Sequence, residues 1–282
     1  MTRNINISYI HGTTAEEQQR LANLNTLTNS SFIDFLQIRK TDRILELGSG
    51  LGILAEKISH QLTTGKVTGI EISEAQLAGC PAETGKLEFI QGDVHRLPLE
   101  NNSFHTVYCR YILEHVNDPL QVLREAKRVL KPGGTIYIQE NSILLMEFYP
   151  DCPHFKKVWM AFADYQSGIG GDAMIGIRLY EILKRAGFVH PELSLAPEIH
   201  YHEKGTLVPW IDNLIGNIMG ARNPLIQNNF ITTREFSQAL KELENFKKND
   251  YASSYFYWNR AKAVKPVSIK ASPKRSTLVQ QL

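Results

Sequence analysis

A glycine-rich turn between a short apolar strand and a helix constrains this chain more than any other feature. Residues 43–52 read RILELGSGLG, an apolar run of strand type followed by Gly48, Gly50 and Gly52, and a helical pattern of apolar residues starts at Ile53. Glycine permits positive φ and lets a ligand lie against bare backbone. The following helix begins with free N–H groups. The stretch therefore predicts a nucleotide-binding corner.

The spacing of the glycines distinguishes between two kinds of nucleotide. A dinucleotide fold has the pattern G-x-G-x-x-G, whose third glycine would fall at position 53, where this chain has Ile53. Here the pattern is E-x-G-x-G-x-G, with Glu46 at the end of the strand. A carboxylate suits a cationic ligand such as S-adenosylmethionine, which carries an ammonium and a sulfonium and no phosphate. An ordinary tight turn remains the alternative at this point.

Composition and charge exclude several other classes of protein. The 282 residues suffice for one elaborated domain or two small ones, and the net charge of +2 gives no general attraction to nucleic acid or anionic membranes. Cys80, Cys109 and Cys152 show no C-x-x-C spacing, so neither a disulfide framework nor a metal site is expected. The N-terminus lacks the apolar segment of a secretory signal, and no run of 18 apolar residues occurs. We expect a cytoplasmic monomer or homodimer without a membrane or nucleic-acid partner.

Strands and helices alternate from residue 42 onwards. This order predicts an α/β fold with a doubly wound, mostly parallel, seven-stranded Rossmann-like sheet whose last two strands form an antiparallel pair. The expected strands are 43–47, 66–72, 86–91, 104–109, 135–139, 192–201 and 255–264. Two N-terminal helices, interrupted at 28–31, are expected before the sheet, and further helices at 153–166, 173–186, 207–221 and 233–247.

These patterns divide the chain into four parts. Residues 1–40 are the N-terminal helical segment, and residues 41–203 together with 251–264 are the nucleotide-binding core. Residues 204–250 are a helical cap, or substrate lid, inserted before the last strand. Residues 265–282 carry four Lys or Arg and no acid, which is typical of a disordered basic tail.

Five blocks of sequence, in a fixed order, resemble class I S-adenosylmethionine-dependent methyltransferases. Over residues 40–140 they read ILELGSGLG, GIEI, FIQGDVHRLPL, FHTVYCRYILEHVNDP and VLKPGGTIYI. More narrowly, they are similar to the small-molecule enzymes of the ubiquinone and menaquinone type. YIHGTTAEEQQRL and GGDAMIGIRLYEILKRAGF are similar to bacterial natural-product members of that branch. The chain departs from the family at Gly79-Cys80-Pro81, which ends the helix after the second strand early.

The resemblance implies S-adenosylmethionine as the cofactor. Glu71, at the end of the second strand, would hold the ribose hydroxyls, because a carboxylate can accept two O–H donors. Asp93 would accept a hydrogen bond from the adenine amino group, although an aspartate after a glycine also holds ordinary turns. Val94 would lie against the adenine ring, and Arg110 beside the methionine part. The other expected cofactor residues are Glu46, Gly48, Ser49, Gly50, Gly52 and Ile72.

The implied reaction is methyl transfer to an O, N or C nucleophile of a small acceptor. Alignment of donor and acceptor can supply ~7–11 kcal/mol of the barrier reduction, and a base is needed only when the acceptor must lose a proton. His115 is the candidate base because its near-neutral pKa suits this work, though it can equally cap or pack. The expected acceptor-side residues are Tyr9, His11, Tyr111, Glu140, Asn141, Trp159 and Trp210.

The sequence disfavours one rival function and leaves another open. A nucleic-acid methyltransferase is disfavoured, because residues 109–112 read CRYI and lack the Asn/Asp-Pro-Pro-aromatic box that holds a flipped base. A binding protein or cyclase on the same scaffold, holding the cofactor without methyl transfer, remains open because its donor-site residues would be identical. The aromatic residues proposed for the acceptor side also have the helical spacing of an ordinary core.

Overall fold

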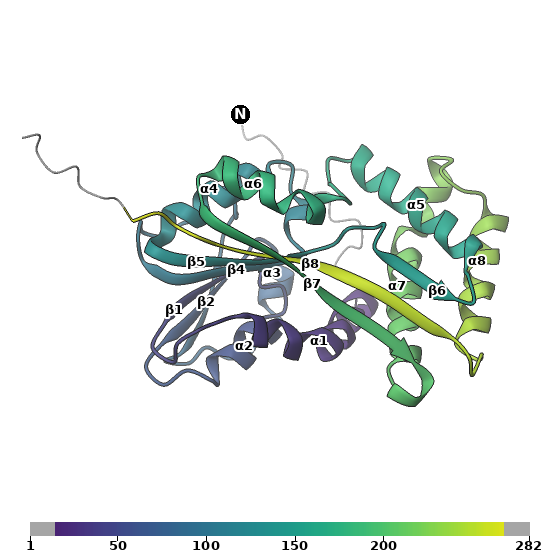
Figure 1. Cartoon of the computed structure of the whole chain (residues 1–282), viewed down its shortest axis with the longest axis horizontal. Coiled ribbons are helices and arrows are strands. Elements are labelled where there is room, and N and C mark those ends of the chain that lie inside the picture. Colours follow the sequence, from purple (N-terminus) through teal and green to yellow (C-terminus); the bar gives the residue numbers. More distant parts are fainter. Residues whose placement is uncertain (1–14, 268–282) are drawn as a thin grey trace, which may run out of the picture.

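The computed structural model describes residues 15–267, shown as a ribbon in Figure 1. The predictions for Tyr9, His11 and residues 268–282 lie outside this part of the chain. In the described part, one sheet of eight strands is flanked by helices on both faces, and further helices form a cap beyond the end of the parallel strands (Figure 1). The predicted α/β class and Rossmann-like sheet are confirmed.

Five strands form the parallel half of the sheet. Their order in space is β3 (Leu87–Gln91), β2 (Lys66–Glu71), β1 (Arg43–Leu47), β4 (Phe104–Arg110) and β5 (Leu130–Glu140). Side chains alternate between the two faces, as the period of a strand requires. In β1, Leu45 and Leu47 join the core cluster under α4 (Pro119–Val129) and α6 (Leu179–Ala186). Ile44 joins the cluster under α1 (Ala15–Phe35) and α2 (Ile53–Ser59). Glu46 therefore faces the same side as Ile44.

A long antiparallel strand, β8 (Ser253–Val264), joins this half to the cap. One edge of β8 pairs with β7 (Val189–Tyr201) over its whole length, which confirms the predicted antiparallel pair. The other edge pairs first with β6 (Met146–Tyr149) and then with β5. The predicted count of seven strands was wrong. Strand β6 has only four residues, and they pair with the first residues of β8, Ser253–Phe256, beneath the cap. Its alternating pattern is therefore too short to be recognised in the sequence.

The helices agree with the predicted positions, with two corrections. Helix α1 runs without interruption through residues 28–31, because the Thr28 hydroxyl donates to the Leu24 carbonyl (2.8 Å) and is satisfied inside the helix. The region 173–186 starts as a 3-10 turn (Ile175–Arg178), and only its second half is α-helical. The helices are α1 (Ala15–Phe35), α2 (Ile53–Ser59), α3 (Glu74–Leu77), α4 (Pro119–Val129), α5 (Pro153–Gly168), α6 (Leu179–Ala186), α7 (Leu207–Gln227) and α8 (Thr233–Phe246).

The cap consists of α7 and α8, which form the predicted insertion, and of α5, which was expected in the core. The three helices pack on one another, on β6 and on the first half of β8 (Figure 1). Helices α7 and α8 are inserted between β7 and β8, as expected. Helix α8 begins with a capping box, in which Thr232 accepts from the Glu235 N–H and Glu235 accepts from the Thr232 N–H. Within residues 15–267, no helix is both long and apolar enough to cross a bilayer.

Candidate functional site

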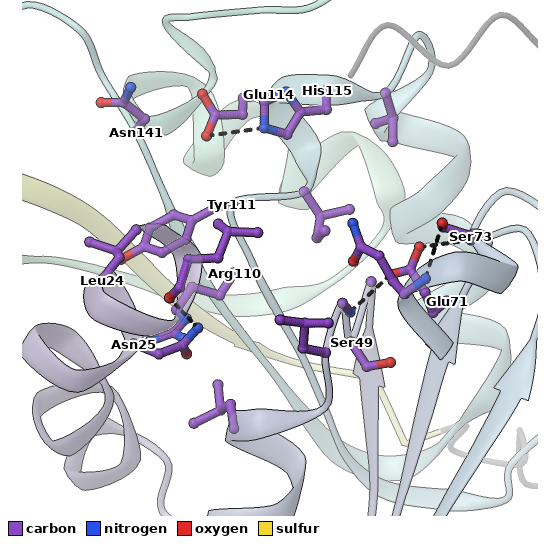
Figure 2. A pocket seen from close by; sticks show the side chains of 18 of the residues that line it. Leu24, Asn25, Ser49, Glu71, Ser73, Arg110, Tyr111, Glu114, His115 and Asn141 are labelled. Atoms are coloured by element: carbon purple, nitrogen blue, oxygen red, sulfur yellow. Dashed lines mark hydrogen bonds and ion pairs between the residues drawn. The ribbon is translucent and has the colours of Figure 1, made fainter. Parts of the chain in front are cut away.

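A single cavity of ≈ 490 Å³ begins at the carboxyl ends of β1, β2 and β4 and continues under the cap (Figure 2). This end of a parallel sheet is where open α/β folds bind their ligands. Helix α1 contributes one wall, and α5, α7 and β8 contribute the far end. Of the predicted site residues, those lining it are Glu46, Gly48, Ser49, Gly50, Glu71, Ile72, Asp93, Val94, Arg110, Tyr111, His115, Asn141, Trp159 and Trp210.

The glycine turn has the backbone that only glycine adopts without strain. Gly48, Gly50 and Gly52 have φ of 67°, 54° and 69°, all in the left-handed region. A Cβ on Gly48 would overlap the side chain of Ile112, and one on Gly52 would overlap Phe89. Gly52 itself lies behind the turn rather than in the cavity lining. The three glycines are therefore required by the shape of the turn as well as by any ligand.

Glu71 is fixed at the cavity wall by backbone amides. Its Oε2 accepts from the Gly50 N–H (2.9 Å), and its Oε1 accepts from the N–H groups of Ile72 (3.0 Å) and Ser73 (2.9 Å) (Figure 2). The carboxylate thereby ties the glycine turn to the start of α3. A carboxylate offers about four lone-pair sites. The three amides use three of these sites, so capacity remains for one O–H donor of a ligand.

Glu46 and Arg110 place a carboxyl group and a guanidinium in the lining of the same cavity. Burial raises the pKa of Glu46 to about 8, although the nearby Arg110 guanidinium opposes this shift. Oε2 of Glu46 has no hydrogen-bond partner among the described residues. On α1, Arg110 donates to Asn25 (2.5 Å; Figure 2) and to Asn29 (2.7 Å). At neutral pH the site thus holds a protonated acid whose ionised form a ligand cation would stabilise.

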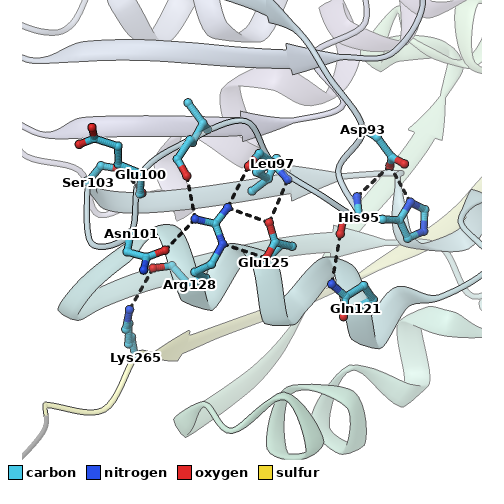
Figure 3. A network of polar contacts seen from close by, with 11 residues as sticks. Asp93, His95, Leu97, Glu100, Asn101, Ser103, Gln121, Glu125, Arg128 and Lys265 are labelled. Atoms are coloured by element: carbon cyan, nitrogen blue, oxygen red, sulfur yellow. Dashed lines mark hydrogen bonds and ion pairs between the residues drawn. The ribbon is translucent and has the colours of Figure 1, made fainter.

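The loop after β3 is held in place from α4. Oδ1 of Asp93 accepts from the His95 N–H (2.8 Å) and lies 2.7 Å from Nδ1 of the same residue (Figure 3). Arg128 donates to the Leu97 carbonyl (2.9 Å) and pairs with Glu125, which anchors the next part of the loop. Sequence reasoning missed His95 as a cavity residue. The only signal for it was its position two residues after Asp93, which is typical of a side-chain turn.

Aromatic side chains surround the far half of the cavity. Trp159 stacks on Phe162 at 5.6 Å between ring centroids, and Trp210 donates from Nε1 to Ser254 Oγ (3.1 Å). Tyr111 lies 4.4 Å from Trp258, centroid to centroid. Lining residues that sequence reasoning missed include Arg20, Leu24, Asn25, Asn213, Leu214, Asn217, Phe256 and Trp258. They come from α1, α7 and β8, which are far apart in the sequence.

His115 is the candidate base, and it lies at the junction of the two halves. Its Nε2 is 3.8 Å from Glu114 Oε1, and its Nδ1 is 3.5 Å from Gln166 Nε2. Burial lowers the pKa of the His115 ring, and the Glu114 carboxylate opposes this effect. The ring is therefore neutral at pH 7, which is the state that can accept a proton.

Glu140 is not where the sequence placed it. It was expected to contact the acceptor, but it is fully buried and outside the cavity lining. Its Oε1 accepts from the N–H groups of Ile112 (3.0 Å) and Leu113 (2.9 Å). The side chain therefore lies behind the turn that carries Tyr111 and His115, because the end of β5 directs it under that turn.

Sequence comparisons identify the kind of domain that these residues form. Residues 45–138 match a family model described as a methyltransferase domain. A demethylmenaquinone methyltransferase of Staphylococcus aureus is 33% identical over 159 residues, which cover 55% of this chain and 64% of that protein. An uncharacterized 37.1 kDa protein in transposon TN4556 of Streptomyces fradiae is 34% identical over 172 residues, 57% of this chain and 48% of that protein. The chain thus spans less than two thirds of the length of either relative.

Solved structures agree on the fold. A Bacillus halodurans C-125 structure named as a methyltransferase has a TM-score of 0.56 at 21% identity, covering 85% of this chain and 99% of that one. Phosphoethanolamine N-methyltransferase 2 of Haemonchus contortus, in complex with phosphomonomethylethanolamine and S-adenosylhomocysteine, has a TM-score of 0.52 at 19% identity, covering 89% and 53%. The cyclase SpnF has a TM-score of 0.51 at 19% identity, covering 85% and 81%.

The fold is Rossmann-like, with a cavity at the carboxyl end of its parallel strands. With the sequence matches, residues 45–138 are a methyltransferase domain of class I, the type of enzyme that uses S-adenosylmethionine. The resemblance carried by the five sequence blocks is therefore confirmed.

Proposed function

We propose that this protein transfers a methyl group from S-adenosylmethionine to an O, N or C atom of a small molecule held under the cap. The observation that carries the proposal is the continuity of the cavity. One space joins the glycine turn, Glu71 and Asp93 to an aromatic chamber under α5 and α7. A donor and an acceptor bound in the two halves would meet beside Tyr111 and His115.

The donor half has groups that suit each part of the nucleoside. Glu71 retains acceptor capacity for one ribose hydroxyl, and Asp93 has a second oxygen for the adenine amino group. Ile72 and Val94 are apolar lining residues that would cover the adenine faces. The methionine part carries an ammonium and a carboxylate, for which Glu46 and Arg110 have the complementary charges.

The acceptor half favours a largely apolar molecule with polar groups at a few points. Trp159, Phe162 and Trp210 supply flat apolar surface, and Asn141 and Asn213 supply amide groups. The charged lining residue Arg20 is already paired, because its guanidinium contacts Glu17 through two nitrogens (2.7 and 2.6 Å) and Asn213 through a third (2.8 Å). An anionic acceptor would therefore find this guanidinium already engaged.

The chain's contribution to the chemistry is alignment and exclusion of water. S-adenosylmethionine supplies an activated methyl group whose bond to sulfur breaks with the electron pair left on sulfur. The apolar walls hold the acceptor nucleophile against that methyl group, and alignment of this kind contributes ~7–11 kcal/mol. Where the nucleophile loses a proton, the His115 ring would accept it, and the lowered pKa of this ring supports that role.

A labelled methyl donor tests the proposal. The protein is incubated with S-adenosylmethionine carrying a labelled methyl group and with a panel of neutral aromatic acceptors, and the products are analysed by mass. We expect label in an acceptor together with an equal amount of S-adenosylhomocysteine. A protein that binds S-adenosylmethionine but forms no S-adenosylhomocysteine would instead be a cofactor-holding protein or cyclase, as the fold of SpnF allows.

A further inference from the structure

Glu140 lies outside the cavity, yet it holds the turn that joins the two halves of the cavity. It is the last residue of β5 and is fully buried. One carboxyl oxygen accepts from two consecutive N–H groups, those of Ile112 (3.0 Å) and Leu113 (2.9 Å). The other oxygen, Oε2, has no partner among residues 15–267. The side chain therefore contacts backbone rather than a ligand.

The turn needs an external acceptor. Tyr111, its first residue, has φ of 60° and closes the β4–β5 pairing by donating its N–H to the Gln139 carbonyl (3.0 Å). A 3-10 turn follows at Leu113–His115. The first N–H groups of any such turn have no partner within it. Leu113 is buried and Ile112 is partly buried, so these donors would cost free energy if left unpaired. The Glu140 carboxyl group satisfies them.

The side chains of this turn face both halves of the cavity. Ile112 packs beside Gly48 at the donor end, whereas Tyr111 and His115 line the acceptor end. The turn is also tied to α5, because the Glu114 carbonyl accepts from Gln166 Nε2 (3.1 Å). A shift of the turn would consequently move the two halves relative to each other.

We propose that Glu140 is a positioning residue, which shapes the turn from Tyr111 to His115 so that donor and acceptor meet in line. The kinetic part of this inference rests on the proposed methyl transfer, but the structural part does not. Removal of the carboxyl group leaves two buried N–H donors unpaired and loosens the turn. Glutamine keeps one carbonyl oxygen of the same reach and preserves its shape.

Three variants of the full chain test the proposal. Glu140→Leu removes the acceptor, Glu140→Gln keeps it, and Glu198→Gln is the matched control. Glu198 is also a buried acid with a raised pKa, about 7, but it lies outside the cavity lining. Should Glu140→Leu fail to fold by circular dichroism, Glu140→Asp replaces it, since its shorter side chain does not reach the two amides.

Two readouts are compared for each variant. Hydrogen exchange should accelerate about tenfold or more at the amides of Ile112 and Leu113 in Glu140→Leu, and remain near wild type in Glu140→Gln and the control. Once an acceptor has been identified, kcat for its methylation should fall about tenfold or more in Glu140→Leu, while the dissociation constant for S-adenosylhomocysteine changes less than threefold.

The outcomes separate the inference from the proposed function. Unchanged exchange at the two amides in Glu140→Leu overturns the positioning role, as does an equal loss of turnover in Glu140→Gln and Glu140→Leu. If wild-type protein transfers no methyl group but the exchange pattern is as expected, the turn assignment holds and only the function fails.

Discussion

The side chain of Ile112 occupies the space in which any residue other than glycine at position 48 would need its Cβ. Gly48 belongs to the turn after β1, and Ile112 to the turn after β4. The two turns thus interlock at the middle of the cavity. The glycine is required here both by its left-handed φ of 67° and by a neighbour that cannot move without disturbing the acceptor side.

Gly48→Ala should therefore weaken binding of S-adenosylhomocysteine by about tenfold or more, since a strained backbone of this kind costs about 1–3 kcal/mol. Calorimetric titration measures the change. Gly168→Ala is the control, because Gly168 has open space around it and no positive φ. Equal affinities in wild type and Gly48→Ala would show that the turn does not shape the nucleoside site.

Binding of the cofactor should release protons through Glu46. Burial raises the pKa of this acid to about 8, so it is protonated at pH 7, and the ammonium of a bound ligand would favour its ionised form. Calorimetry at pH 7 in two buffers of different ionisation enthalpy should show release of up to about one proton per ligand. Glu46→Gln should abolish the release. Proton uptake in wild type would contradict the assignment.

The same acid makes folding stability depend on pH. Between about pH 4.5 and 8 the folded chain keeps a proton on Glu46 that the unfolded chain has lost, so stability falls as pH rises through this window. The slope is at most about 1.4 kcal/mol per pH unit for one proton. Denaturant titrations at several pH values should give a shallower fall in Glu46→Gln. Parallel curves for the two proteins would rule out this effect.

If His115 is the general base, the pH dependence of kcat should follow the protonation of its ring. Because burial lowers the pKa of its ring, kcat should fall only on the acid side of pH 6.5, where the ring becomes protonated. His115→Gln should lower kcat about 10²-fold or more and lose that acid limb. Normal turnover of the variant at every pH would mean that His115 only packs against Gln166.

The aromatic chamber should control the acceptor and not the donor. Trp159→Leu removes a stacked ring pair worth about 0.5–1.5 kcal/mol beyond buried area, so KM for the acceptor should rise about threefold to tenfold. Affinity for S-adenosylhomocysteine should stay within twofold. The control is Met160→Leu, the next residue on α5, which is 42% exposed. Equal effects of the two substitutions would place the acceptor elsewhere.

The donor half could be predicted because its signals are local. Glu71 ends a strand, the glycine turn and Asp93 each follow one within a few residues, and parallel strands bring their carboxyl ends to one edge. Adjacent motifs in the chain therefore become neighbours in the cavity. The resemblance of five blocks to one family rested on these same local segments.

The acceptor half could not be predicted in the same way. Trp159, Trp210 and Trp258 come from α5, α7 and β8, and their helical or alternating spacing is that of an ordinary core. Only tertiary packing places them around one space. Glu140 shows the same limit, because its neighbours in sequence do not indicate that its carboxyl group bonds to Ile112 and Leu113, 28 and 27 positions earlier in the chain.

Binding of the sulfur nucleoside is the most direct test of the assignment of this cavity to S-adenosylmethionine. Calorimetric titration of the full chain with S-adenosylhomocysteine should give saturable heat at one ligand per chain, with none for a nicotinamide dinucleotide under the same conditions. Absence of saturable heat with the nucleoside, or equally good binding of the dinucleotide, would contradict the assignment of the glycine turn, Glu46 and Glu71 to this cofactor.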